Sequence, residues 1–225
     1  MDTLTFPGVF DRKVKAFFTG KSPGADLRRI SEIASIGKMQ IYMPIQKHTD
    51  KVLLLDSLEP KIADAVITDR KDVLIGVQGA DCVPVLLYDR RTCATGAVHA
   101  GWRGTAAEIL KKTIRVMGQR FSSSPEDILI AIGPGIRSCC YGVGPEVIDA
   151  VRGATGEGDY FTVKGEKNFL DLPAANRYQA MSVGVRPENI WMSEDCTFCL
   201  PEKYYSYRFA KGPTGRQGGF IRIVG

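Results

Sequence analysis

Short apolar runs rich in Val, Ile, Tyr and Phe recur along the chain, and Gly, Pro or charged residues separate them. Runs of this length and composition are typical of β-strands. The pattern predicts strands at Val14–Thr19, Met39–Ile45, Val52–Leu55, Ala65–Thr68, Val73–Val77, Val83–Tyr88, Thr95–His99, Ile128–Ile132, Ile190–Met192, Tyr204–Phe209 and Phe220–Val224.

Helical spacing, with apolar residues three and four positions apart, is found in fewer segments. An Asp or Thr precedes several of them, and such a side chain accepts a backbone N–H of the first turn. The predicted helices are the segment after Asp26 through Ile36, a longer one capped by Thr105 and ending at Gln119, one from Leu172 to Val183 capped by Asp171, and a short one beginning at Pro145.

The order of these elements indicates a fold class. Strands outnumber helices and do not alternate with them regularly, so the pattern favours an α+β fold with mixed sheets layered with helices over a doubly wound parallel fold. The chain has no repeat, low-complexity tract or obvious linker. We therefore expect residues 1–225 to form a single domain.

The composition further restricts the class of protein to which the chain can belong. The chain has 225 residues, of which 44% are hydrophobic and 24% charged, as in an ordinary globular protein. No stretch approaches the roughly 18 apolar residues of a membrane span, and the first residues lack the apolar centre of a signal peptide, so we expect a cytoplasmic protein that binds no membrane. Lys and Arg exceed Asp and Glu by 30 to 25 and are scattered, which does not favour nucleic-acid binding.

The chain has only two histidines, and both lie at the ends of predicted strands. His48 is in PIQKHTDKV and His99 in AVHAGWRGT, while Cys82 lies 17 positions before His99 in GADCVPVLLYD. Three ligands of these types suit a catalytic zinc ion, which keeps its fourth position for water or substrate. Two other interpretations are open: Cys82 as a nucleophile with His99 as its base, or residues that only pack within the fold.

The histidine and cysteine counts bear on other metals. A blue-copper centre alone takes two histidines and a cysteine, so no histidine would be left for an oxygen-reducing copper cluster. The histidine count therefore excludes a multicopper oxidase. The segment CTFC, Cys196 to Cys199, has the spacing of half a structural zinc site, but no second CxxC pair exists, and Cys139 and Cys140 are adjacent. The sequence therefore favours no second metal, and Cys93 is interpreted as a packing residue.

Arginines near the Gly-rich motifs are candidates for binding an anion. Arg103 follows HAGW at an expected helix start, where backbone N–H groups favour a phosphate or carboxylate. Arg208 ends the run YYSYR, and Arg216 lies in GPTGRQGG. Asp81, beside Cys82, is either a proton carrier or a residue that caps its turn. The chain contains neither the GxxxxGK[ST] pattern of a P-loop nor a GxGxxG motif, so these two modes of nucleotide binding are not supported.

Taken in order, QKHTDKV, GADCVPVLLYD, AVHAGWRGT, IGPGIRSCCYGVGPEV, DLPAANRYQ, CTFC and YYSYRF with TGRQGGFIRI resemble the YfiH-like or laccase-domain family, also called polyphenol oxidase or peptidoglycan editing factor. The resemblance implies a layered α/β/β/α sandwich similar to the catalytic domain of cytotoxic necrotizing factor. It also implies zinc-dependent phosphorolysis of adenosine, inosine and methylthioadenosine, with adenosine deamination as a further activity. The family's copper-oxidase label names copper as another metal.

The implied metal ligands are His48, Cys82 and His99. From the residues themselves we expect Cys82, His99, Asp81 and Arg103 to form the catalytic set. Arg103, Arg208 and Gln46 are expected to bind nucleoside and phosphate. Two departures are visible: FFTGKSPGADL stands where relatives carry TTRxGG, and SYRF stands for SYRR. An amide hydrolase that edits peptidoglycan precursors and a non-catalytic metal or nucleoside binder are the alternatives, and the oligomeric state and preferred purine stay open.

Overall fold

Two mixed β-sheets pack face to face in the computed structural model, which describes residues 3–34 and 40–224. The first sheet has the order β1 (Leu4–Thr5), β2 (Val14–Thr19), β14 (Gln217–Ile223), β6 (Val73–Gly79) and β3 (Gln40–Tyr42). The second has the order β13 (Ile190–Met192), β9 (Ile128–Ile132), β7 (Val83–Asp89), β8 (Thr95–Ala100), β5 (Ala65–Thr68) and β4 (Val52–Leu54). The pairs β3–β6, β13–β9 and β4–β5 are parallel and the others antiparallel.

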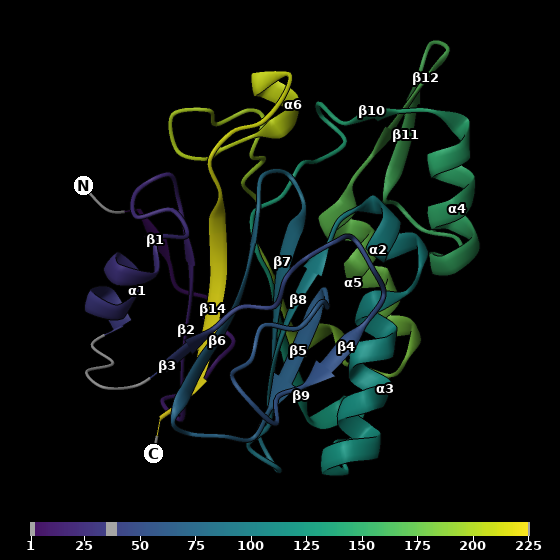
Figure 1. Cartoon of the computed structure of the whole chain (residues 1–225). Helices are drawn as coiled ribbons and strands as arrows, with labels where there is room; N and C mark the ends of the chain where they lie inside the picture. The colour runs from purple at the N-terminus through teal and green to yellow at the C-terminus, as the bar shows by residue number, and fades with distance from the viewer. Residues whose placement is uncertain (1–2, 35–39, 225) are drawn as a thin grey trace.

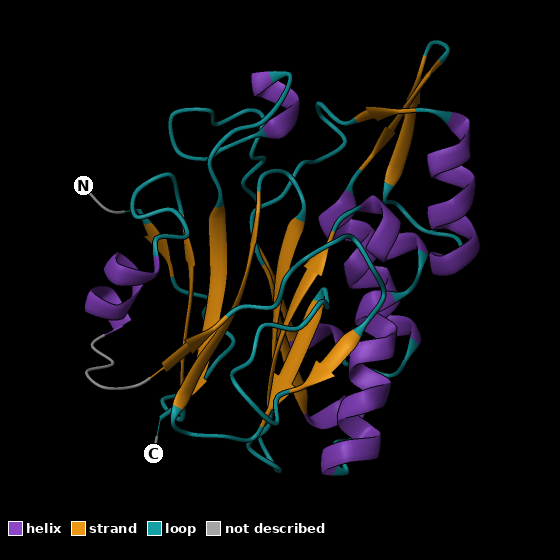
Figure 2. Ribbon diagram, in the orientation of Figure 1, coloured by secondary structure: helices purple, strands orange, loops and turns teal. Residues whose placement is uncertain are grey.

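Helices cover the outer faces of both sheets (Figures 1 and 2). The first sheet is covered by α1 (Leu27–Ala34), and the second by α2 (Trp102–Ala106), α3 (Ile109–Phe121) and α5 (Leu172–Ser182). Beside them lie α4 (Pro145–Thr155) and a small antiparallel sheet of β10 (Gly142–Val143), β12 (Lys167–Leu170) and β11 (Phe161–Lys164). The remaining short helices are η1 (Pro125–Asp127), η2 (Pro187–Asn189) and α6 (Tyr207–Ala210). The expected α+β class and its α/β/β/α layers are thus confirmed.

Strand β7 shows how the sequence pattern produces these layers. All seven of its residues are buried, and successive side chains of a strand point to opposite faces. Val83, Val85 and Leu87 pack toward the helices, whereas Leu86 and Tyr88 pack toward the other sheet. A continuous apolar run is therefore what a strand between two apolar layers requires.

Most predicted elements are present. Four strands have the expected bounds: Val14–Thr19, Ala65–Thr68, Ile128–Ile132 and Ile190–Met192. Two predicted caps are also confirmed, because Asp26 Oδ1 accepts the N–H of Arg28 at 2.9 Å and Asp171 Oδ1 accepts that of Ala174 at 2.9 Å. The expected end of the first helix, at Ile36, lies outside the described residues.

Two predictions are wrong. The expected strand Tyr204–Phe209 instead contains α6, which Ser206 caps by accepting the N–H of Phe209 at 3.0 Å. The expected single helix from Thr105 is two helices, because Glu108 takes a left-handed conformation with φ 60° between them. Thr105 is buried inside the first of these, where its hydroxyl accepts a hydrogen bond from Asn176 at 3.0 Å.

The strands that the pattern misses are short or exposed. The hairpin β11–β12 turns at Gly165, whose φ of 61° suits glycine, and Thr162 to Lys164 are exposed. Each strand of this hairpin has only four residues, two of them apolar, so neither contains an apolar run of the length that predicts a strand. Within the described residues, no helix is both long and apolar enough to cross a membrane.

Candidate metal and substrate site

A cavity of about 680 Å³ lies where the β6–β7 turn, the end of β8, α2 and α6 meet. Every residue expected at the site lines it, although these residues come from distant parts of the sequence. The lining residues are Gln46, His48, Gln78, Gly79, Ala80, Asp81, Cys82, His99, Trp102, Arg103, Ile136, Tyr141, Leu172, Tyr207, Arg208 and Arg216.

His48, Cys82 and His99 point their donor atoms toward one another. One ligand atom from each lies within 4.8 Å of the other two, and Cys82 Sγ is 3.8 Å from His48 Nε2. Antiparallel pairing of β7 with β8 brings the thiol to His99, because Pro84 is opposite His99 and Cys82 is two positions earlier. The predicted neighbouring strands therefore do bring thiol and imidazole together.

Gly101 allows the close approach of these groups. A Cβ atom at Gly101 would lie 2.7 Å from Cys82 Sγ and 3.2 Å from His48 Cδ2. The backbone φ of Gly101 is −76°, which any residue can adopt, so only the lack of a side chain matters here. The space beside the sulfur thus depends on a glycine of the HAGWRG motif.

Asp64 holds the loop that carries His48. Its fully buried carboxylate accepts the backbone N–H groups of Lys47 at 3.1 Å, His48 at 3.0 Å and Thr49 at 2.6 Å. His48 has a left-handed backbone with φ 57°, which is uncommon outside glycine. These three hydrogen bonds offset the cost of that conformation and direct the imidazole toward Cys82.

The same carboxylate orients the other imidazole. Asp64 Oδ1 accepts a hydrogen bond from His99 Nδ1 at 2.9 Å, which turns His99 Nε2 toward the thiol and the cavity. Such carboxylate–imidazole pairs are common beside metal-bound histidines. Sequence reasoning did not select Asp64, although an acidic residue directly before the buried strand Ala65–Thr68 was a usable signal.

The groups of the site shift one another's pKa. Burial raises the pKa of the Cys82 thiol, but the imidazoles of His48 and His99 outweigh it and lower that pKa to about 6. Burial lowers the pKa of His99, but Asp64 and Cys82 outweigh it and raise that pKa to about 9. Burial raises the pKa of Asp64, yet hydrogen bonds from His99 and Thr49 bring it below its usual range. The site therefore favours a thiolate at neutral pH, the form in which cysteine binds metals.

The donor set fits a zinc-class metal. Two imidazoles and one thiolate are ligands that zinc prefers, and three protein ligands leave a position open toward the cavity. The pairing of His99 with Asp64 fixes which ring nitrogen is available, and Gly101 keeps space beside the sulfur. These residues can hold one metal ion.

Three arginines lie around the same cavity. Arg103 is exposed and stacks over the ring of Trp102, 4.4 Å from its centroid. Arg208 lies 4.9 Å from the centroid of Tyr141 and donates to the carbonyl of Gly142 at 2.8 Å. The guanidinium of Arg216 donates to nearby loop carbonyls. Three cationic side chains therefore line the cavity together with the candidate metal ligands, as an anion site requires.

Gln46 and Asp81 are tied to the protein itself. The amide of Gln46 makes two hydrogen bonds with the backbone of Gln78, at 2.7 and 2.9 Å. Asp81 Oδ1 accepts the hydroxyl hydrogen of Thr197 at 2.7 Å, and Asp81 Oδ2 accepts the N–H of Arg208 at 2.8 Å. Both residues line the cavity, but their side chains also hold its wall in place.

The protein is thus a mixed α+β fold with a cavity that is lined by three residues of types that bind metals and by cationic side chains. The chain belongs to the family described as multi-copper polyphenol oxidoreductase laccase, whose model matches residues 24–224. A purine nucleoside phosphorylase of Clostridium acetobutylicum is 41% identical over 179 residues, which are 78% of this chain and 74% of that protein. Another of Aquifex aeolicus is 39% identical over 168 residues, 74% of this chain and 75% of that protein.

Solved structures show the same fold. YlmD from Geobacillus stearothermophilus has a TM-score of 0.89 at 27% identity, covering 97% of this chain and 94% of that one. The hypothetical protein YfiH of Bacillus licheniformis has a TM-score of 0.86 at 30% identity, covering 94% and 93%. The resemblance inferred from the sequence motifs is confirmed.

Proposed function

We propose that this protein is a zinc-dependent purine nucleoside phosphorylase that converts adenosine, inosine and methylthioadenosine to the free base and ribose 1-phosphate or its methylthio form. The convergence of His48, Cys82 and His99 in a cavity with Arg103 and Arg208 carries the proposal. The relatives named purine nucleoside phosphorylase support it.

His48, Cys82 and His99 would hold the metal, with His99 oriented by Asp64. When bound, a metal of this class supplies Lewis-acid stabilisation of negative charge at its open position. The family description names copper, but two histidines are too few for a multicopper oxidase cluster. A single zinc ion therefore accounts better for this donor set.

The arginines would bind the attacking phosphate. In phosphorolysis a phosphate oxygen forms a bond to C1′ of the sugar while the bond from C1′ to the purine nitrogen breaks. Arg103 and Arg208 can neutralise the phosphate and orient it, since guanidinium groups bind phosphate through paired hydrogen bonds. Tyr207 is 52% exposed and lines the same cavity, so its ring offers a face on which the purine can stack.

The leaving purine needs a proton or a strong hydrogen bond. The chain has no third histidine, and among the described residues lining the cavity the only carboxylate belongs to Asp81. Both of its oxygens already accept hydrogen bonds from Thr197 and Arg208. We therefore assign Asp81 the role of positioning Cys82 and Arg208. Bound phosphate or water would supply the proton to the leaving purine.

Two other activities are the alternatives to phosphorolysis at this cavity. Adenosine deamination would use the same cavity, with water in place of phosphate. An amide hydrolase with Cys82 as nucleophile and His99 as base is supported by the lowered pKa of Cys82 beside two imidazoles. The hydrolase needs no metal, whereas the phosphorylase does. The effect of a chelator on activity therefore distinguishes these two activities.

The decisive experiment incubates the purified protein with inosine or adenosine, with and without phosphate, and identifies products by chromatography. We expect free base and ribose 1-phosphate only when phosphate is present, with activity lost after chelation and restored by zinc. Inosine formed from adenosine without phosphate would indicate deamination. Activity unchanged by chelation and by substitution of His99 would overturn the proposal.

A further inference from the structure

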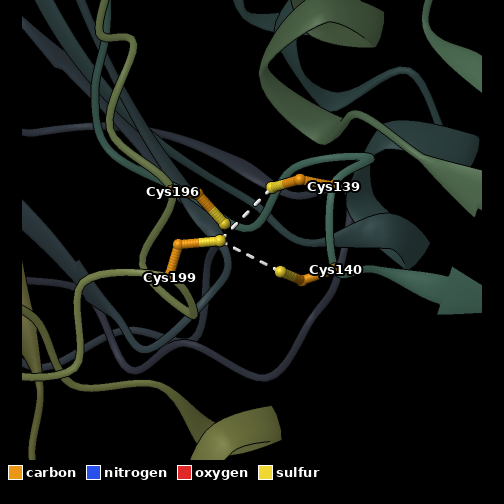
Figure 3. A group of neighbouring side chains, drawn as sticks. All are labelled: Cys139, Cys140, Cys196 and Cys199. Carbon is orange, nitrogen blue, oxygen red and sulfur yellow. Dashed lines mark hydrogen bonds between the residues drawn. The ribbon is translucent and has the colours of Figure 1, made fainter.

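Four cysteines gather at one place outside the lining of the cavity (Figure 3). Cys139 and Cys140 lie in the turn before β10. Cys196 and Cys199 lie in the loop after β13, about sixty positions further along the chain. Their four sulfur atoms all lie within 4.8 Å of one another. The fold thus supplies the second pair of thiols that the sequence lacks as a CxxC motif.

We propose that these four thiolates bind one zinc-class divalent cation. Four sulfurs at the usual Zn–S distance of about 2.3 Å form a tetrahedron with edges of about 3.8 Å. Cys199 Sγ lies 3.5 Å from Cys139 Sγ and 3.0 Å from Cys140 Sγ, so small side-chain movements reach that geometry. All six cysteines are free thiols, which leaves these four available as ligands.

Backbone geometry supports the arrangement. Gly135 and Cys196 are joined by a bridge between their backbones, and the amide of Thr197 donates to the carbonyl of Gly135 at 3.2 Å, so the two segments are already fixed side by side.

The donor set indicates what the cation would do. Four soft thiolates favour zinc and fill a tetrahedral shell, which leaves no position for substrate. Each thiol would lose its proton to solvent as the cation binds. Cys139 and Cys199 are exposed while Cys196 is buried, so the cation can enter from solvent.

The cluster adjoins the cavity wall. Cys140 directly precedes Tyr141, which lines the cavity, and Cys196 directly precedes Thr197, whose hydroxyl holds Asp81 beside Cys82. A bound cation would link these two segments. Its role would therefore be structural, stabilising the wall that carries part of the candidate active site.

The first test is metal content after purification under reducing conditions in zinc-containing medium. We expect the double variant Cys196→Ser/Cys199→Ser to contain one equivalent of zinc less than wild type and to unfold at a lower temperature. Cys93→Ser is the matched control, since Cys93 contacts Tyr88 and lies outside the cluster, and should keep the full zinc content. Equal zinc content in wild type and the double variant would overturn the proposal, whether or not the cavity site binds metal.

A second test keeps the cluster intact in case the double variant does not fold. The variant Cys82→Ala removes the thiolate of the cavity, and metal-free protein is then titrated with Co²⁺. We expect strong thiolate-to-cobalt charge-transfer absorption with the visible bands of tetrahedral cobalt. Absence of that absorption, or a disulfide between Cys199 and Cys139 or Cys140 in the purified protein, would contradict the proposal. Neither result depends on phosphorylase activity.

Discussion

Asp64 binds His99 Nδ1 at 2.9 Å and, with the same carboxylate, accepts the backbone amide of His48 at 3.0 Å. One buried acid thus positions two of the three candidate metal ligands, although it contacts neither the cavity nor the thiol. The pairing fixes the ring orientation of His99 and the backbone conformation of His48 together. The geometry of the site therefore depends on Asp64.

The substitution Asp64→Asn should weaken metal binding about 10–100-fold, the usual effect of removing a group that orients a metal ligand. One oxygen becomes an NH₂ group that faces N–H donors, so the loop of His48 loses hydrogen bonds. Competition with a chromophoric chelator measures the affinity. Asp72→Asn is the control, because Asp72 is exposed and pairs with Arg70, and it should bind metal like wild type. Unchanged affinity in Asp64→Asn would contradict the assignment.

Gly101→Ala should abolish metal binding and activity while leaving the fold intact. The added methyl group would lie 2.7 Å from Cys82 Sγ and 3.2 Å from His48 Cδ2, so these two candidate ligands would have to shift from their present arrangement. Metal content and circular dichroism of the purified variant check this prediction. Gly153→Ala is a matched control, since nothing lies within 4 Å of a Cβ there, and within α4 it should stabilise the protein by roughly 0.5–1 kcal/mol. Full metal content in Gly101→Ala would show that the site tolerates the methyl group.

Most of the layered fold and the three candidate metal ligands could be predicted from the sequence, for a physical reason. Strands buried on both faces, such as β7, are continuous apolar runs, and the chain has only two histidines to consider. Hairpin β11–β12 could not be predicted from an apolar run, because each of its strands has only four residues, two of them apolar. Helix α6 could not either, because the aromatic residues before it resemble a strand, and the short helix depends on the cap of Ser206.

The parts of the site that escaped prediction depend on tertiary contacts. Asp64 lies sixteen positions from His48 and thirty-five from His99, and no local spacing relates them. Likewise, Cys139 and Cys140 complete a four-thiol cluster only because two loops meet. A motif shows which residue types are present, whereas the fold decides which of them meet.

Arg103→Ala and Arg208→Ala should each raise the KM for phosphate about 10–100-fold, because a hydrogen bond between charged groups contributes roughly 1.5–3 kcal/mol. The KM for inosine should change much less. The backbone N–H of Arg208 still holds Asp81 in the alanine variant, so the cavity wall is retained. Arg115→Ala, on the exposed face of α3 beside Glu108, is the control. A lower kcat with unchanged phosphate KM would contradict the role in phosphate binding.

Acid stability should depend on Asp89, a buried carboxylate far from the candidate site. Burial raises its pKa, but hydrogen bonds from the hydroxyls of Ser123 and Thr92 and the amide of Arg91 outweigh it, so the pKa is lowered. A lowered pKa stabilises the fold above the unfolded value of about 4, and this stabilisation is lost as the pH falls through the folded value. Asp89→Asn should therefore be about 1–3 kcal/mol less stable at pH 7.

The difference between wild type and Asp89→Asn should shrink as the pH falls below about 4, since only the wild type takes up a proton at this position. Denaturant unfolding at a series of pH values measures the difference directly, and other acidic groups cancel because both proteins contain them. Thr92→Val, which removes one hydroxyl donor at 2.7 Å, should show a smaller loss in the same direction. A difference that stays constant from pH 7 to pH 3 would show that Asp89 has no lowered pKa in the folded protein.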